Sequence, residues 1–385
     1  MLERRSFLKT ALISLASLST SSIPVWAVED QKADEAKPDV KTSAPKVEVV
    51  FCLDTTGSMG GLIQGAKDKI WSICNQIVGG KPSPELKVGL VAFRDRGDQY
   101  VTKVFDLSDD LDKIHGHLKE FQAGGGGDGP ESVNEALDVS VNKISWSKFR
   151  NDDETLRIIF LVGDAPPHMD YNDDVKYAVS CEKACRMGII INTVQCGNDG
   201  ECTKFWQDIS KKAEGQYVKI AQTGGVQVVS APQDKRLAEI NGELSRTTVA
   251  FGDAKARGEA KEKDEAARAL APAAQADRAL FNARKAQNAA YDLVDQVKQG
   301  KVKLEDLKKE ELPEELQKMT VEERKKHLEE LDKKRDALRR EALELDKQRT
   351  EFLNKKLAEN KGKDGFDQQV LEMLRTQAKK AKIGY

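Results

Sequence analysis

Short apolar runs alternate with amphipathic helical patterns between residues 46 and 252 of the 385-residue chain. Four runs have the length and β-branched content of strands buried on both faces: 47–53, 86–93, 157–162 and 189–194. The segments between them repeat apolar residues at helical spacing: 62–78, 111–121, 131–144, 175–187 and 203–213. Strands that alternate with helices predict an α/β domain with a doubly wound, mostly parallel sheet.

Two weaker runs complete this α/β pattern. Residues 100–105 are typical of an edge strand, and residues 216–220 fit a last strand that precedes a helix at 233–244. We therefore place the α/β domain at residues 46–252.

Residues 253–385 carry no strand pattern and are rich in Ala, Lys, Glu, Leu and Arg, so we expect an all-α region. Thr320 and Glu323 have the spacing of a capping box that opens a long helix. Apolar residues then recur every seven positions, at Leu331, Leu338, Leu345 and Phe352. The alternate positions of that seam weaken a coiled coil, because they are Arg335, Ala342 and Arg349. A coiled-coil dimer and a helix folded back on its neighbours both remain open, and so does the oligomeric state.

The first 27 residues are interpreted as a targeting segment. Arg4 and Arg5 precede Ser-Phe-Leu-Lys and a mildly apolar run, which resembles a twin-arginine (Tat) export signal, and residues 25–27 offer a cleavage site. The apolar run is short and rich in serine, so we expect no stable membrane anchor after cleavage. Residues 28–45 are charged, lack aromatic residues and fit a flexible linker. The resemblance implies a periplasmic or secreted protein.

The net charge bears on the class of partner, and the cysteines bear on disulfide formation. A net charge of -2 gives no basic footprint for nucleic acid, so we expect no nucleic-acid partner. In an oxidising compartment Cys196 and Cys202 are the first candidates for a disulfide. We prefer to interpret the cysteines as small buried hydrophobic residues, at positions Cys52, Cys74, Cys181, Cys185, Cys196 and Cys202.

Oxygen-bearing side chains follow two of the predicted strands. Asp54, Thr56 and Ser58 come directly after the first strand, and Asp164 follows the strand at 157–162. Because ligands bind at the carboxyl ends of strands in such sheets, these segments should meet. Carboxylate and hydroxyl oxygens are hard ligands suited to Mg²⁺, Mn²⁺ or Ca²⁺.

This arrangement resembles the metal-ion-dependent adhesion site of von Willebrand factor A (VWA) domains. The Asp-x-Thr-x-Ser element at 54–58 is a form of that site's Asp-x-Ser-x-Ser motif, and Gly163-Asp164 matches its second element. The resemblance implies a six-stranded sheet with one antiparallel strand. It also implies a metal that completes its coordination with water or with an acidic side chain of a protein partner.

One position departs from the family pattern. The usual distant Thr ligand has no obvious counterpart, and Asp128 stands in its place within a glycine-rich loop. Asp128 either ligates the metal, directly or through water, or caps the following helix. Three carboxylates would outweigh the charge of one divalent ion and weaken its pull on an acidic partner. Glu131 is either a partner of the dipole in the first turn of that helix, which we favour, or a further ligand.

These residues indicate an exported, divalent-metal-dependent protein-binding module of adhesion or scaffold type. We do not expect catalysis, because His168 is the sole candidate general base near the site and no hydrolase pattern accompanies it. Two alternatives stay open: a metal-dependent enzyme or enzyme subunit, and a structural protein whose metal only stabilises the fold.

The export interpretation yields the first prediction. Replacing Arg4 and Arg5 by Lys should leave the precursor in the cytoplasm, because the arginine pair is read by a receptor and tolerates little change. Cell fractionation and immunoblotting measure the outcome. A normal periplasmic yield of the double variant would exclude this export pathway.

Overall fold

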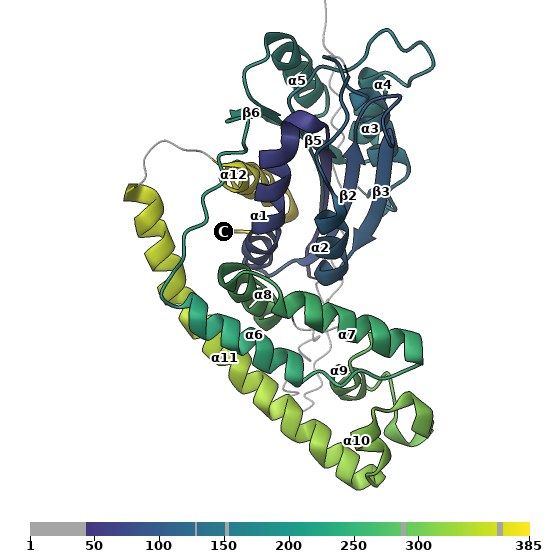
Figure 1. The fold of residues 1–385 in the computed structure, drawn as a ribbon, viewed down its shortest axis with the longest axis vertical. Helices are drawn as coiled ribbons and strands as arrows, with labels where there is room; N and C mark the ends of the chain where they lie inside the picture. The colour runs from purple at the N-terminus through teal and green to yellow at the C-terminus, as the bar shows by residue number, and fades with distance from the viewer. Residues whose placement is uncertain (1–43, 128, 151–153, 286–289, 360–364) are drawn as a thin grey trace, which may run out of the picture. The chain divides into compact units, whose positions relative to one another are not determined.

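The computed structural model describes residues 44–385 apart from 128, 151–153, 286–289 and 360–364 (Figure 1). The predicted targeting segment at 1–27 and most of the predicted linker at 28–45 lie outside these residues. Six strands form one sheet in the order β3-β2-β1-β4-β5-β6, in which only β3 is antiparallel. They are β1 Lys46–Asp54, β2 Glu85–Phe93, β3 Thr102–Ser108, β4 Thr155–Gly163, β5 Ile189–Cys196 and β6 Tyr217–Ile220. The predicted fold class is therefore confirmed.

Helices lie between the strands and after the last one, much as the hydrophobic periodicity predicts. Between strands are α1 Gly60–Val78, α2 Leu111–Glu120, α3 Val133–Asn142, α4 Tyr177–Arg186 and α5 Gly200–Lys212, and α6 Asp234–Arg246 follows β6. One boundary differs in a way that matters below: α3 begins at Val133, so Glu131 precedes the helix and does not lie in its first turn.

The strand β1 shows why the sheet needs cover on both sides. Its side chains alternate between the two faces, as in any strand, yet from Val47 onward all of them are buried. Val47, Val49 and Phe51 belong to one apolar cluster, whereas Val50 and Cys52 belong to another. Helices α3, α4 and α5 supply the second cluster.

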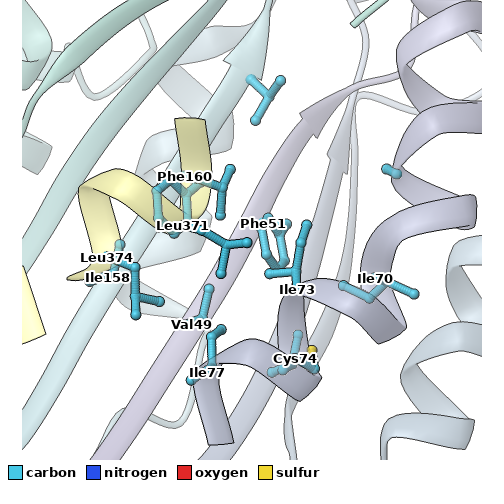
Figure 2. Close-up of a cluster of buried hydrophobic side chains, with 14 of the residues drawn as sticks. Val49, Phe51, Ile70, Ile73, Cys74, Ile77, Ile158, Phe160, Leu371 and Leu374 are labelled. Atoms are coloured by element: carbon cyan, nitrogen blue, oxygen red, sulfur yellow. The ribbon is translucent and has the colours of Figure 1, made fainter. Parts of the chain in front are cut away.

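The other face is covered by α1, α2 and a helix from the far end of the chain, α12 Phe366–Ala378. Figure 1 shows α12 returning beside α1. Figure 2 shows Leu371 and Leu374 of α12 packed among residues of the sheet and of α1, including Val49, Phe51, Ile158, Phe160, Ile73 and Ile77. A polar pair fixes the contact, because the side-chain amides of Gln377 and Asn192 on β5 exchange hydrogen bonds of 2.8 and 3.0 Å.

The remaining helices are α7 Ala254–Arg268, α8 Pro272–Arg284, α9 Leu293–Lys298, α10 Glu314–Gln317 and α11 Val321–Glu359. The all-α assignment of this region is confirmed. The capping box is present, since the N–H of Thr320 donates to Glu323 Oε2 at 2.8 Å and the N–H of Glu323 donates to Thr320 Oγ1 at 3.2 Å. Helix α11 packs against α6, α8 and α9 of the same chain (Figure 1).

The two arginines that weaken the coiled-coil pattern hold α11 in place. Arg335 is 1% exposed and pairs with Asp292 at 2.8 Å and with Asp295 at 2.9 Å. Arg349 pairs with Asp234 at 2.6 Å and with Asp277 at 2.7 Å. Of the two interpretations of the heptads, the packing within the described residues matches the helix folded back on its neighbours.

Residues 44–385 cluster as one compact unit. The boundary at residue 252 between an α/β domain and a helical domain stays a prediction, but α12 contributes to the main apolar cluster of the sheet. None of the helices that the structure describes is long and apolar enough to cross a membrane.

The packing of α12 gives the second prediction. Leu374→Ala removes a fully buried side chain from the sheet face and should lower the free energy of unfolding by about 2–5 kcal/mol. Glu372→Ala, on the exposed side of the same helix, should change it by no more than about 0.5 kcal/mol. Urea unfolding followed by circular dichroism compares the two. Equal stability of both variants and wild type would show that α12 is not part of the folded core.

Candidate metal centre

The candidate site lies where β1 and β4 end at the same edge of the sheet. These strands are parallel neighbours, so Asp54 at the end of β1 and Asp164, which follows β4, come close together. A Cβ built on Gly163 would lie 2.9 Å from Asp54 Cβ and 3.1 Å from Asp54 Oδ2. Only a glycine at this position leaves room for the Asp54 carboxylate.

The loop after β1 points its polar groups at the Asp54 carboxylate. Asp54 is 1% exposed, and its Oδ1 accepts hydrogen bonds from the N–H and the hydroxyl of Thr56 at 2.8 and 2.7 Å. Thr56 Oγ1 lies 3.4 Å from Ser58 Oγ. The second carboxylate oxygen, Asp54 Oδ2, is buried without a hydrogen-bond partner. Such a group is costly to bury unless a cation or water meets it.

Asp164, which follows β4, contributes the second carboxylate of the candidate site. Its Oδ2 accepts a hydrogen bond of 2.5 Å from Gln222 Nε2, and the same amide lies 3.5 Å from the carbonyl of Ser58. The structure thus brings together four of the five predicted metal ligands: Asp54, Thr56, Ser58 and Asp164. The fifth, Asp128, lies outside the described residues. Ligation by any of the five stays a prediction.

Burial makes the Asp54 carboxylate a strong candidate for cation binding. Removal from water is the main cause that raises the pKa of Asp54 to about 7. The charge of Asp164 adds to the rise, and hydrogen bonds from Thr56 and from the backbone of Asp164 oppose it. Among the described residues, no group of three or more His, Cys, Asp and Glu side chains is close enough to hold a metal alone. A site here would therefore depend on the hydroxyls of Thr56 and Ser58 as well as on its carboxylates.

Comparison with known proteins shows what the α/β part of the chain is similar to. Residues 48–233 match the family model described as von Willebrand factor A domain. The chain is 28% identical over 215 residues to mouse von Willebrand factor A domain-containing protein 7, and 32% identical over 147 residues to the human protein. These alignments cover 56% and 38% of this chain, but only 22% and 15% of the relatives.

Residues 48–233 are thus similar to a VWA domain, over just under half of the chain.

The chain spans less than a quarter of the length of these curated relatives. Among solved structures, the VWA domain of SpRpn10 aligns with a TM-score of 0.34 and 14% identity, over 46% of this chain and 89% of its own. Proximal thread matrix protein 1 from mussel byssus aligns with a TM-score of 0.34 and 15% identity, over 46% of this chain and 42% of its own.

Glu131 lies beside the predicted metal ligands, a place that the favoured sequence interpretation did not give it. It is 3% exposed, and its Oε2 has no hydrogen-bond partner. Burial raises the pKa of Glu131 to about 9, and the charge of Asp54 is the next cause. The assignment to a helix dipole fails because α3 starts two residues later. The glycine-rich loop marked the segment, but no spacing rule indicates which way the side chain turns.

Gln222 also escaped the sequence interpretation. It is an exposed residue after the last strand, and it reaches the site only because β6 brings it to the same edge of the sheet. A Cβ on Gly197 would lie 2.1 Å from Gln222 Oε1, so the close approach of this amide depends on a glycine after β5.

His168 is buried next to this centre. Its Nδ1 lies 2.8 Å from Asp170 Oδ1 and its Nε2 lies 3.3 Å from Asp95 Oδ2, while the ring stacks on Tyr171 at 4.0 Å. The same Asp95 accepts hydrogen bonds from Ser132 Oγ at 2.8 Å and Tyr171 Oη at 2.9 Å. His168 therefore holds two loops together, because it joins the segment after β2 to the segment after β4.

All six cysteines are free, and five are buried. Burial raises the pKa of each of the thiols Cys52, Cys74, Cys181, Cys196 and Cys202. This matches the interpretation as small hydrophobic residues. No disulfide joins Cys196 and Cys202 in the structure.

The raised pKa of Asp54 gives the third prediction, for protein kept free of divalent ions by EDTA. The folded protein binds the Asp54 proton more tightly than the unfolded chain, whose carboxyl titrates near 3.8, so this group loses its contribution to stability as the pH rises from about 4 through 7. Stability in EDTA should therefore fall between pH 5 and pH 8, and Asp54→Asn should flatten that fall. Urea titrations across this range measure it.

Asp138→Asn provides the control, since this acid lies on α3 and accepts a hydrogen bond from Asn142. It should follow the wild type at every pH. If Asp54→Asn also follows the wild type, the Asp54 carboxyl does not titrate in this range.

Proposed function

We propose that the VWA domain binds one divalent cation through Asp54, Thr56, Ser58 and Asp164, and that it uses this cation to hold a protein partner. VWA domains are generally protein-interaction modules, which agrees with this proposal. Mg²⁺ is the ion we favour, with Mn²⁺ and Ca²⁺ as alternatives, because all the oxygens are hard ligands.

The observation that carries the proposal is the orphaned carboxylate oxygen of Asp54. Its Oδ2 is buried without a partner, while Oδ1 and the Thr56 and Ser58 hydroxyls lie within one hydrogen-bonded group. No positive charge is among the neighbours that shift the pKa of Asp54. A divalent ion would supply the missing charge and would accept oxygen ligands, as the chemistry of this donor set demands.

Exposure supports a binding role in preference to a purely structural one. Ser58 is exposed although Asp54 and Thr56 are buried, and the glycines at 125–127 beside it are exposed as well. When bound, the ion would supply a positive charge that a ligand from outside the chain can approach. The chain's own part is to fix the oxygens: the Thr56 N–H orients the Asp54 carboxylate, and Gln222 orients Asp164.

We propose binding in preference to catalysis because of the position of His168. Both ring nitrogens lie against carboxylates, and the side chain is 5% exposed. A general base has to reach the proton of a bound substrate, and this ring is enclosed by protein groups.

We also propose that the protein acts after export, in the periplasm or outside the cell. The support is the sequence of residues 1–27 alone, with Arg4 and Arg5 ahead of an apolar run.

The fourth prediction is that divalent ions stabilise the wild type and not Asp54→Ala. An ion that binds only the folded state adds about 2.7 kcal/mol at a concentration roughly a hundred times its dissociation constant. Thermal melting in EDTA and in rising Mg²⁺ or Mn²⁺ measures the gain. Asp138→Ala should respond as the wild type does. If wild type and Asp54→Ala respond identically to each ion, the cation site does not exist.

The partner half of the proposal needs a separate experiment. Immobilised wild type should retain a protein from a periplasmic extract in Mg²⁺ and release it in EDTA, whereas Asp54→Ala should retain it in neither buffer. A wild type that binds the ion but retains the same proteins in both buffers would favour the alternative in which the metal only stabilises the fold.

A further inference from the structure

Five acidic side chains are grouped at the carboxyl edge of the sheet, and they differ in how the protein satisfies them. The group comprises Asp54, Asp95, Asp98, Glu131 and Asp164. Burial is the main cause of the raised pKa of Glu131, and the charges of the four aspartates are the further causes. Asp98 Oδ2 accepts from the backbone N–H of Gly126 at 3.0 Å. Asp95 and Asp164 accept hydrogen bonds from protein side chains, as described above.

Two oxygens in the group are left over. Asp54 Oδ2 and Glu131 Oε2 are both buried, and neither has a hydrogen-bond partner in the described part of the chain. Asp54 is 1% exposed and Glu131 is 3% exposed, so bulk water does not satisfy these oxygens. Nearby buried carboxylates cannot both ionise without a large cost unless a compensating charge is present. A cation between the loops would supply that charge for both.

The position of Glu131 relative to Thr56 indicates how it acts. A Cβ placed on Gly126 would lie 3.1 Å from Glu131 Oε1, 3.2 Å from Thr56 Cβ and 3.5 Å from Thr56 Cγ2. Glu131 and the methyl group of Thr56 therefore both border Gly126, whereas the Thr56 hydroxyl lies close to Asp54 and Ser58.

Backbone contacts hold the Glu131 segment rigidly. The N–H of Glu131 donates to the carbonyl of Pro166 at 2.9 Å, and its carbonyl accepts from the N–H of His168 at 3.1 Å. These bonds tie the residue to the loop that follows β4, which also carries Asp164. A side chain anchored in this way is preorganised to meet a ligand and does not need to reach for it.

We infer that Glu131 is a further acidic residue of the cation site, which accepts a hydrogen bond from a water bound to the cation and raises the affinity of the site. This inference rests on the proposed cation binding. It has a consequence for the partner: with Asp54, Asp164 and Glu131 around one divalent ion, the negative charge exceeds the positive charge. A neutral or basic group of the partner then suits the open side better than a carboxylate.

The experiment compares Mn²⁺ binding by the full chain in wild type and in Glu131→Gln, with free Mn²⁺ measured by electron paramagnetic resonance. Loss of an acidic group behind a metal ligand typically weakens binding roughly 10- to 100-fold, and we expect a loss in this range. Glu131→Asp keeps the charge and should lose less affinity than Glu131→Gln. Glu135→Gln, on α3 with its carboxylate 3.3 Å from Thr102 Oγ1, should bind as the wild type does.

Thermal melting of each variant in EDTA checks that any loss of Mn²⁺ affinity does not come from loss of the fold. Wild-type affinity in Glu131→Gln, or equal losses in the Gln and Asp variants, would overturn the inference while Mn²⁺ binding by the wild type keeps the proposed function. Absence of Mn²⁺ binding by the wild type would overturn the proposed function itself.

Discussion

A parallel sheet that is buried on both faces needs two covering layers, and this constraint shapes the whole chain. The buried run from Val47 to Asp54 leaves no face of β1 for solvent. Connecting helices cover one face completely, but α1 and α2 leave part of the other face to α12. The helices between α6 and α12 therefore have to return the chain to the sheet. The buried ion pairs of Arg335 and Arg349 with aspartates of neighbouring segments hold α11 in position between them.

Strands and helices of the α/β part could be predicted because their signals are local. Each buried run is continuous, and each helix repeats its apolar face at short spacing. The return of α12 could not be predicted in this way, because Leu371 and Leu374 look like the apolar stripe of any amphipathic helix. Tertiary packing determines which residues these two leucines contact. The heptad at Leu331 and Leu338 left two packings open for the same reason, because the partners of the buried arginines are aspartates in neighbouring helices.

The residues of the candidate site also fall into a group that could be predicted from the sequence and a group that could not. Asp54, Thr56, Ser58 and Asp164 follow strand ends in the sequence, so the topology of the sheet alone brings them together. Glu131 and Gln222 reach the site through loops, and the direction of a loop side chain depends on contacts that no periodicity records. In Glu131 those contacts are two backbone hydrogen bonds to the loop after β4. The unbalanced charge at this edge thus exceeds what the motif residues suggest.

The position of α12 also bears on how the molecule is made. The Tyr385 hydroxyl donates to the carbonyl of Ile77, a residue 308 positions earlier, at 2.9 Å. Contacts of such long sequence separation form late, because the loop between them has to close first. During synthesis, the apolar face of β1 and β4 stays without its last cover until residues 366–385 have left the ribosome. A chain that stops before residue 366 therefore presents an uncovered sheet face to chaperones and proteases.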